Sequence, residues 1–309
     1  MLRVSPYALL VLANLLWGGN FVIGRAIAES LPPYTLSFLR WCTAFFVFLP
    51  FAWPKVRREW PLLRANMPVL ILMALTGIVG FNTFLYIALH YTTSINASLV
   101  NSSTPIVICI LSFFILRERL NRNQTMGIVL SLAGVLFILS KGSFSALLTF
   151  SFNAGDILVI AALVCWSIYS VLVKKYTGVL PGYSTFFVCM ILGIITLFPF
   201  FLYERLVTQV PIVWSVGSVL TILYTGVFAS IVAFISWNSA VAQIGPGKAG
   251  VFLNLIPVFA AAFAILFIGE RIAWYQAAGG LFVILGVYIS TRILRTGAAR
   301  SIEQKQSTG

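Results

Sequence analysis

Long apolar stretches separated by short polar segments run along almost the whole chain. A helix needs about 20 mostly apolar residues to cross the hydrocarbon core of a bilayer. The stretches are continuously apolar rather than alternating, which indicates membrane-spanning helices instead of the strands of a β-barrel. Ten spanning helices are predicted, at about residues 6–28, 33–53, 67–89, 93–116, 125–140, 154–174, 183–204, 212–242, 246–268 and 273–294.

The same pattern of residues occurs twice. With a shift of 152 residues, the block Pro105, Glu118, Arg119, Gln124, Gly127, Gly134 matches Pro257, Glu270, Arg271, Gln276, Gly279, Gly286. With a shift of 149, Trp17 matches Trp166 and Thr76-Gly77 matches Thr225-Gly226. Each copy holds five predicted helices, an odd number, so the second copy enters the membrane the opposite way up. Such inverted repeats are typical of transporters with a central substrate site.

The predicted fold is therefore an all-α integral membrane protein. Two inverted five-helix repeats are expected to surround a central cavity. The first repeat is assigned to residues 1–145 and the second to residues 146–296, followed by a cytoplasmic tail at 297–309.

Composition and basic residues set the predicted location and orientation. Hydrophobic residues make up 60% of the chain, charged residues 9%, and the mean hydropathy is +1.01. If the N-terminus is cytoplasmic, fifteen of the twenty Lys and Arg lie on the inner side of the membrane. Lys141, Arg205 and Arg271 lie in outer loops, and Arg25 and Arg40 lie within or at the ends of helices. Because cytoplasmic loops are enriched in Lys and Arg, we predict an inner-membrane protein with both termini cytoplasmic. The net charge of +13 then reflects topology and attraction to anionic lipid, not nucleic-acid binding.

Motifs for enzymatic, metal or cofactor chemistry are not found in the sequence. The chain has one histidine, and its four cysteines lie inside apolar segments without ligand spacing. The segment Gly245–Gly250 matches G-x-G-x-x-G, but no strand precedes it and no βαβ unit fits here. A tight turn opening the ninth helix is the preferred interpretation, with a substrate carboxylate at its N–H groups as the alternative. No enzyme, cofactor or metal is predicted.

Uncharged polar and aromatic residues at membrane depth are the candidate binding site. Asn14 and Trp17 are three residues apart and share one helical face. Polar side chains need partners in lipid, so they should face the interior, either lining a cavity or bridging neighbouring helices. The full predicted substrate-binding set is Asn14, Trp17, Asn82, Tyr86, Asn101, Ser102, Trp166, Tyr169, Trp237 and Asn254.

Prolines and charged residues inside the segments have more than one interpretation. Pro105 and Pro257 are predicted to interrupt their helices, as hinges or as static kinks. Glu118 and Glu270 are predicted to favour the positive N-terminal end of the following helix. Arg40 is expected to pair or snorkel. No carboxylate is predicted at the midplane, where a dedicated proton or cation antiporter would ordinarily need one.

The repeated Pro…Glu-Arg…Gln…Gly…Gly block and the Trp in the first helix of each half resemble the drug/metabolite transporter superfamily, EamA type. The resemblance covers nearly the whole chain. Within that family the chain is similar to the YddG-type aromatic amino-acid exporters, although the repeat block is shared by relatives with other substrates. Membership implies ten helices around a central cavity that is lined mainly by the first, third, fourth, sixth, eighth and ninth helices.

Three hypotheses for function follow. The first is export of neutral, largely apolar amino acids, aromatic ones among them, and related metabolites by alternating access, since Asn and Ser groups can hold a zwitterion and aromatic rings its side chain. The second is efflux of aromatic cations, against which the missing buried acid argues. The third is a membrane receptor or scaffold that does not transport. The expected partners are a small-molecule substrate and the lipid bilayer; the oligomeric state is open, and a monomer is compatible with the sequence.

Overall fold

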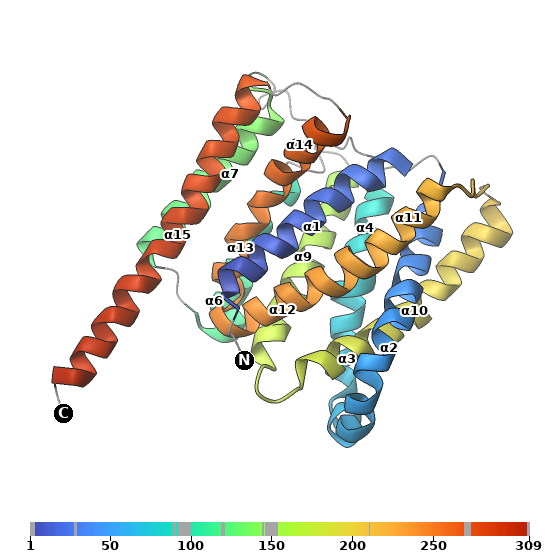
Figure 1. Cartoon of the computed structure of the whole chain (residues 1–309), viewed down its shortest axis with the longest axis horizontal. Coiled ribbons are helices and arrows are strands. Elements are labelled where there is room, and N and C mark those ends of the chain that lie inside the picture. The colour runs from blue at the N-terminus through green and yellow to red at the C-terminus, as the bar shows by residue number, and fades with distance from the viewer. Residues whose placement is uncertain are drawn as a thin grey trace.

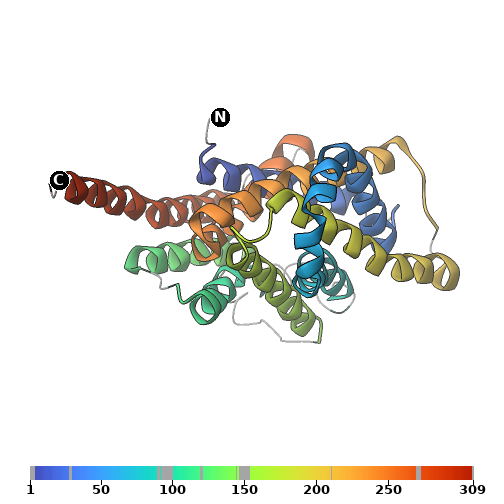
Figure 2. The ribbon, with the colours of Figure 1, turned by 90° about the horizontal axis from the view of Figure 1, so that it is seen from below.

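Helices form all the regular secondary structure in the part of the chain that the structure describes. The computed structural model describes residues 4–27, 30–88, 91, 100–118, 121–143, 145, 154–209, 211–268 and 273–307. The α-helices are α1 (Pro6–Ile27), α2 (Pro33–Ala65), α3 (Met67–Met73), α4 (Phe81–Ala88), α6 (Thr104–Leu116), α7 (Arg122–Leu139), α9 (Ala154–Lys175), α10 (Gly182–Tyr203), α11 (Val216–Tyr224), α12 (Ala233–Ile244), α13 (Pro246–Gly250), α14 (Leu255–Ile268) and α15 (Trp274–Ser307). Figures 1 and 2 show them as a bundle from which the C-terminal part of α15 projects.

Most of these helices belong to stretches that are long and apolar enough to span a membrane. Among the described residues, eight stretches are long and apolar enough: Pro33–Ala65, Met67–Leu85, Arg122–Leu139, Ala154–Lys175, Gly182–Thr208, Val216–Ile244, Pro246–Phe263 and Trp274–Thr291. In addition, α1 has 22 residues and α6 is a shorter apolar helix of 13 residues. The all-helical membrane fold is thus confirmed. The count of ten spanning helices stays a prediction.

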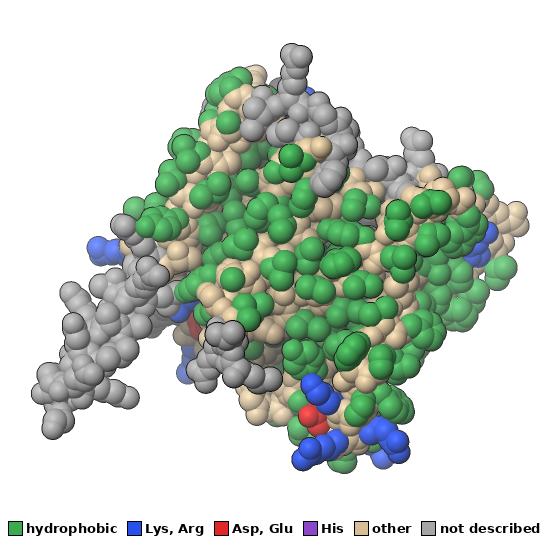
Figure 3. Space-filling model, viewed as in Figure 1, with side chains coloured by type: hydrophobic (Ala, Val, Ile, Leu, Met, Phe, Trp, Pro, Cys, Tyr) green, Lys and Arg blue, Asp and Glu red, His purple; other side chains and the backbone are tan. Residues whose placement is uncertain are grey.

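The surface of the bundle exposes many large apolar side chains, and Lys and Arg gather at one end of the face in Figure 3. Large side chains such as Phe46, Phe51 and Phe114 are about 70% exposed, as expected for residues that face lipid. Figure 3 shows apolar side chains over most of one face and Lys and Arg gathered at its lower end. We call this the basic end; it holds the junction of α2 with α3 and the turn between α9 and α10 (Figure 1).

Two predicted helices differ in length from the sequence-based boundaries. The second was predicted to end at residue 53, but α2 continues to Ala65 although Pro54 and Pro61 lie within it. Its extension is held by burial, because Val56 and Leu63 pack into the main hydrophobic core. The segment 297–309, predicted as a tail, is helical as far as Ser307 and continues α15.

Two of the spanning segments change from α-helix to π-helix at the repeated Thr-Gly pair. The π-helix η1 (Ala74–Gly80) connects α3 to α4, and η3 (Thr225–Val232) connects α11 to α12. A Cβ added at Gly226 would lie 2.9 Å from the carbonyl oxygen of Arg40 in α2, which explains why glycine is needed there. Such π-segments leave backbone carbonyls without their usual helical partners, and they are frequent at functional sites.

The repeated glycines pack α7 against α15. A Cβ added at Gly127 would lie 2.6 Å from the carbonyl oxygen of Gly286, and one at Gly134 would lie 2.6 Å from that of Gly279. Because these contacts are backbone against backbone, no side chain fits at any of the four positions. The pairing is crossed: the first glycine of one copy meets the second glycine of the other.

The repeated Gln residues cap the N-termini of α7 and α15. At the start of α7, the backbone N–H of Asn121 donates to Gln124 Oε1 at 2.9 Å, and Gln124 N–H donates to Asn121 Oδ1 at 2.9 Å. This is a capping box. At the start of α15, Ala273 N–H donates to Gln276 Oε1, also at 2.9 Å. The repeated Gln therefore accepts the same backbone hydrogen bond at a helix start in each half.

Candidate functional site

Three tryptophans from three helices meet near the middle of the bundle. The ring centroids of Trp17 (α1) and Trp166 (α9) are 5.3 Å apart, and Trp237 (α12) lies 5.7 Å from each of them. All three side chains are more than nine-tenths buried. The sequence analysis predicted this set of tryptophans as one site, and the structure brings them into direct contact.

Two further rings complete what we call the aromatic cluster, namely Trp17, Trp41, Trp166, Phe234 and Trp237. Phe234 lies 5.9 Å from Trp17, 5.5 Å from Trp166 and 5.2 Å from Trp41, each edge to face. Edge-to-face pairs at these distances are favourable by about 0.5–1.5 kcal/mol beyond burial. Sequence reasoning missed Phe234 and Trp41. The only signal for Phe234 was its position three residues before Trp237, on the same face of α12.

The N–H groups of the three tryptophans are not equally satisfied. Trp17 Nε1 donates to the carbonyl of Ala229 in η3 at 3.1 Å, and Trp237 Nε1 donates to Ser170 Oγ at 3.3 Å. Trp166 Nε1, like Nε1 of Trp41 in the same cluster, is buried and has no hydrogen-bond partner among the described residues. An unpaired buried donor costs about 1–3 kcal/mol, so it is a natural contact for a ligand acceptor.

Asn14 supplies an unpaired acceptor one helical turn before Trp17. Its Nδ2 donates to the carbonyl of Leu10 at 2.6 Å. Its Oδ1 is buried without a partner in the part of the chain that the structure describes. The centre of the bundle therefore offers an unused acceptor on α1 and an unused donor on α9.

Tyr169 is joined to a residue that the sequence analysis did not select. Its ring lies 5.5 Å from that of Trp166. Its hydroxyl donates to Asn238 Oδ1 at 3.1 Å and accepts from Asn238 Nδ2 at 2.8 Å. Asn238 follows Trp237 directly, and an Asn within a predicted membrane-spanning segment was an available signal. The Tyr169–Asn238 pair links α9 to α12 beside the aromatic cluster.

The remaining predicted polar residues have mostly local partners. Asn82 Nδ2 donates to the carbonyl of Ile78 one turn earlier, at 3.0 Å. The carbonyl of Asn101 accepts from Thr104 Oγ1, and Ser102 is buried in the same turn. Asn254 Nδ2 donates to Ser131 Oγ at 2.8 Å and so bridges η4 (Val251–Asn254) to α7. For Asn254 the structure therefore favours the bridging interpretation.

Tyr86 belongs to α4, but its side chain lies outside the described part of the structure, as do Glu270 and Arg271.

Both candidate hinge prolines lie at helix starts. Pro105 is in the first turn of α6 (Thr104–Leu116), and Pro257 is in the first turn of α14, directly after the 3-10 turn Val251–Asn254. The sequence analysis expected them to interrupt continuous helices. Instead they begin new ones, where the missing N–H breaks no helical hydrogen bond. A hinge role at the breaks before them stays a prediction.

The segment Gly245–Gly250 forms the predicted tight turn. Gly245 has a φ of +84°, and Pro246 begins α13. The carboxylate of Glu118 lies here, because a Cβ added at Gly245 would be 2.9 Å from Glu118 Oε1. Glu118 was expected to serve the helix that follows it, but it lies against the start of α13. An internal carboxylate thus lies beside the turn that was considered for a substrate carboxylate.

The other buried charges stabilise the fold near helix ends. Glu204 accepts hydrogen bonds from the backbone N–H groups of Tyr34 at 3.2 Å and Thr35 at 2.6 Å, and so caps α2. Arg40 donates to Ser230 Oγ at 3.0 Å and lies 5.3 Å from the ring of Trp41, so it pairs as expected. Among the described residues, no group of three His, Cys, Asp or Glu could hold a metal ion.

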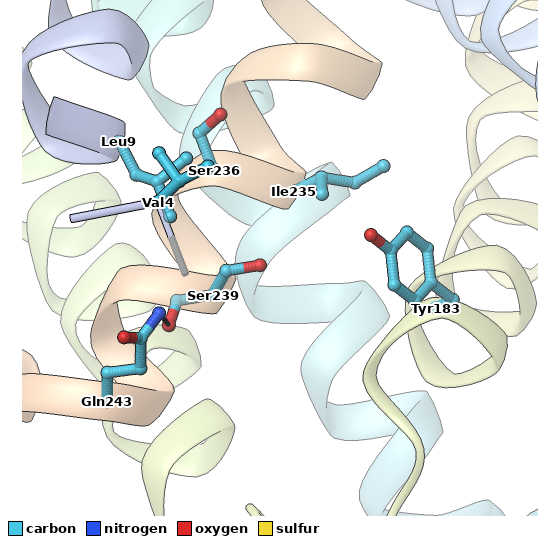
Figure 4. Close-up of a pocket in the computed structure, with 7 residues that line it drawn as sticks. All are labelled: Val4, Leu9, Tyr183, Ile235, Ser236, Ser239 and Gln243. Atoms are coloured by element: carbon cyan, nitrogen blue, oxygen red, sulfur yellow. Dashed lines mark hydrogen bonds between the residues drawn. The ribbon is translucent and has the colours of Figure 1, made fainter. Parts of the chain in front are cut away.

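A recess lies at the basic end. The Tyr169–Asn238 pair separates it from the aromatic cluster. The recess has two lobes of about 510 and 300 Å³ that share Tyr183, Ile235 and Ser239. Figure 4 shows Ser236, Ser239 and Gln243 along α12, with Tyr183 pointing toward them from α10. Tyr169 and Asn238 line the smaller lobe. We call this the basic-end recess.

Known proteins with similar sequences are transporters. The EamA-like transporter family model matches residues 4–140 and again residues 153–292. The uncharacterized transporter YyaM of Bacillus subtilis is 27% identical over 98% of this chain and 99% of its own. A probable amino-acid metabolite efflux pump of Salmonella typhimurium is 27% identical over 93% of this chain and 96% of its own.

A solved crystal structure with 23% identity covers 95% of this chain and 99% of its own at a TM-score of 0.77. This likeness supports the fold. The two family matches cover both halves of the chain, including the aromatic residues and the repeated glycines described above. The chain belongs to the EamA-like transporter family, and it is a membrane transporter of that type.

Proposed function

We propose that this transporter exports aromatic and other neutral amino acids, and related metabolites, across the inner membrane by alternating access. The observation that carries the proposal is the aromatic cluster, with the unpaired Trp166 N–H and Asn14 Oδ1 beside it. Aromatic faces suit a flat apolar side chain, and the two unpaired polar groups suit the carboxylate and ammonium of a zwitterion. The relative described as a probable amino-acid metabolite efflux pump supports the same substrate class.

The proposed architecture is a pair of inverted five-helix repeats. It is supported by the crossed contacts Gly127 with Gly286 and Gly134 with Gly279, because two elements related by a twofold axis meet in such a reciprocal way. The matching π-helices η1 and η3 and the two Gln caps support it as well. In this arrangement Trp17 and Trp166 are counterparts on opposite sides of the axis.

The proposed orientation places the basic end in the cytoplasm together with both termini. The bias of Lys and Arg toward that end supports this choice. The basic-end recess then faces the cytoplasm, where a substrate for export would arrive.

The rings of the cluster touch one another, so a bound side chain has to replace ring–ring contacts with its own. Substrate binding is therefore coupled to separation of α1, α9 and α12, which carry Trp17, Trp166 and Trp237. A ligand shifts a conformational equilibrium only by its differential affinity for the two states. An aromatic substrate offers more stacking than a small one and should drive this separation more strongly.

The test is transport of labelled amino acids in proteoliposomes. Trp17→Ala and Trp166→Ala should raise the half-saturating concentration of L-phenylalanine about 2- to 13-fold more than that of L-alanine, which follows from about 0.5–1.5 kcal/mol of lost stacking. Trp53→Ala is the matched control, because Trp53 is 49% exposed outside the cluster. Equal losses for both substrates, with normal amounts of protein in the membrane, would refute the stacking role.

Efflux of aromatic cations is the second candidate, since the same five rings could attract a cation. The buried carboxylates among the described residues, Asp156 and Glu204, lie at helix ends rather than beside the cluster. The two candidates separate by competition: tetraphenylphosphonium should fail to inhibit phenylalanine transport if amino acids are the substrates.

A further inference from the structure

The smaller lobe of the basic-end recess holds a buried hydroxyl without a partner. Thr185 lines this lobe and is 6% exposed, and its Oγ1 has no hydrogen-bond partner among the described residues. Nearby buried hydroxyls of Ser167, Ser170 and Ser184 all donate hydrogen bonds. An unpaired buried hydroxyl is costly, so it marks a place for a ligand atom.

The same lobe contains the start of a long helix. Gly182, Tyr183 and Thr185 belong to the first turn of α10, which has 22 residues and no side-chain cap. A Cβ added at Gly182 would meet nothing within 4 Å, so space adjoins the helix start. The N–H groups of a helix start and its dipole favour a carboxylate or phosphate.

One charged side chain next to the helix start, that of Lys55, adds to this preference. Lys55 Nζ of α2 lies 4.6 Å from the centroid of the Tyr183 ring at the recess. Ser184, which does not line the recess, donates its hydroxyl hydrogen bond to Glu59 of α2. An ammonium group therefore stands beside the recess lining, and the Glu59 carboxylate lies against Ser184, a residue outside that lining.

The rest of the lobe is apolar and sized for a side chain. Met73, Leu180, Phe186 and Ile235 line it, and its volume of about 300 Å³ is at the lower limit for small-molecule sites. The Tyr169–Asn238 pair lines the same lobe. Since Tyr169 also contacts Trp166, this pair lies between the recess and the aromatic cluster.

We propose that the basic-end recess is a second binding site, which holds an apolar amino acid before it reaches the aromatic cluster. The carboxylate binds the first turn of α10 and the Thr185 hydroxyl, and the apolar side chain packs against Met73, Leu180 and Phe186. The order of the two sites rests on the proposed function. Binding in the recess does not depend on transport and is tested without it.

The experiment measures protection of a thiol in the recess. The variant Ser239→Cys, purified into lipid nanodiscs, is modified with a maleimide, and peptide mass spectrometry resolves the new thiol from the four native cysteines. L-tryptophan and indole-3-propionate, which carry a carboxylate, should slow the modification several-fold. Tryptamine, which has none, should not. Equal protection by tryptamine would overturn the carboxylate assignment.

Two matched variants connect the protection to Thr185. Thr185→Val in the Ser239→Cys background keeps the side-chain volume and removes the unpaired hydroxyl; it should raise the protecting concentration of L-tryptophan about tenfold. Thr35→Val removes another buried unpaired hydroxyl at the opposite end of α2, and should leave protection unchanged. An unchanged protecting concentration in Thr185→Val would contradict the site. A lower thermal unfolding midpoint in Thr185→Val would also contradict it, because the loss of protection would then come from a damaged fold.

Further controls separate this site from the aromatic cluster. Val179→Cys, exposed in the α9–α10 turn outside the recess lining, should show no protection; equal protection there would mean a global conformational change and would overturn the proposal. Trp17→Ala in the Ser239→Cys background should retain protection. Its loss would mean that binding occurs only at the cluster. If the amino acids protect the thiol but no amino acid is transported, the proposed function is wrong and the recess site is still supported.

Discussion

At the residue scale, the informative contrast is between two buried tryptophans that differ in one hydrogen bond. Trp237 Nε1 donates to Ser170, whereas Trp166 Nε1 has no partner among the described residues. Both rings are at least 95% buried in the same cluster. A protein that keeps an unpaired donor at its centre forgoes stability there, and strained or unsatisfied groups of this kind concentrate at functional sites.

This contrast gives a matched pair of substitutions. Trp166→Phe and Trp237→Phe remove the same atoms, so their difference isolates the N–H group. We expect Trp237→Phe to be the less stable of the two by about 0.5–1.5 kcal/mol, because only there is a hydrogen bond lost. Thermal unfolding of the purified variants measures this. We expect Trp166→Phe to show the larger loss of affinity for free L-tryptophan in equilibrium titrations. Equal affinity of both variants would mean that the Trp166 N–H does not contact the ligand.

The meeting of side chains in the candidate site was predictable where a residue type was unusual for its surroundings. Trp17, Trp166 and Trp237 lie deep in apolar segments, away from the interfaces that tryptophan prefers, and they do converge. Phe234 was not predictable, because phenylalanine in an apolar helix is ordinary. Asn254 could not be assigned from sequence, since a polar residue that bridges helices and one that binds substrate satisfy the same requirement for a partner.

At the scale of elements, the repeated glycines act by letting backbones touch. Gly279 lies where a Cβ would be 2.6 Å from the carbonyl oxygen of Gly134, whereas its neighbour Gly280 would meet only Val258 Cγ1, at 3.9 Å. The two positions share one helix, so they differ in packing and not in secondary structure. The sequence repeat alone did not reveal this, because glycine is repeated in turns as well as in helix contacts.

We therefore expect opposite effects from Gly279→Ala and Gly280→Ala. The first forces α7 and α15 apart and should destabilise by about 1–3 kcal/mol. The second adds a better helix former without a clash and should be neutral or stabilising by up to about 1 kcal/mol. Thermal unfolding midpoints in one detergent compare them directly. Equal stability of the two variants would show that the α7–α15 contact is not tight.

Element boundaries failed where packing overrode local signals. The second helix was predicted to end at residue 53, yet α2 continues past Pro54 because the extension buries Val56 and Leu63. The π-segments were not predictable from hydrophobic periodicity, since one extra residue per turn leaves an apolar stretch apolar. By contrast, the sixth and seventh predicted helices, 154–174 and 183–204, match α9 and α10 closely, because clear turn residues separate them.

At the scale of the whole molecule, the position of the acids bears on how transport is driven. A proton-coupled transporter ordinarily needs a titratable group within the membrane that is exposed to each side in turn. Of the buried acids that the structure describes, Glu204 is held by two backbone N–H groups at the start of α2, and Asp156 lies in the first turn of α9. The aromatic cluster and Asn14 carry no net charge.

We therefore expect flux to follow the substrate gradient without an obligatory proton. In proteoliposomes loaded with labelled phenylalanine, efflux should proceed at the same initial rate with a pH gradient and after a proton ionophore has collapsed it, at constant substrate gradient. Glu204→Gln and Asp156→Asn should lower stability, because each removes a charge at a helix start. In both variants the initial efflux rate should still be the same with and without the pH gradient. Efflux that stops when the gradient collapses would show proton coupling. If Glu204→Gln or Asp156→Asn then abolished that dependence, the helix-start acid concerned would be the coupling group.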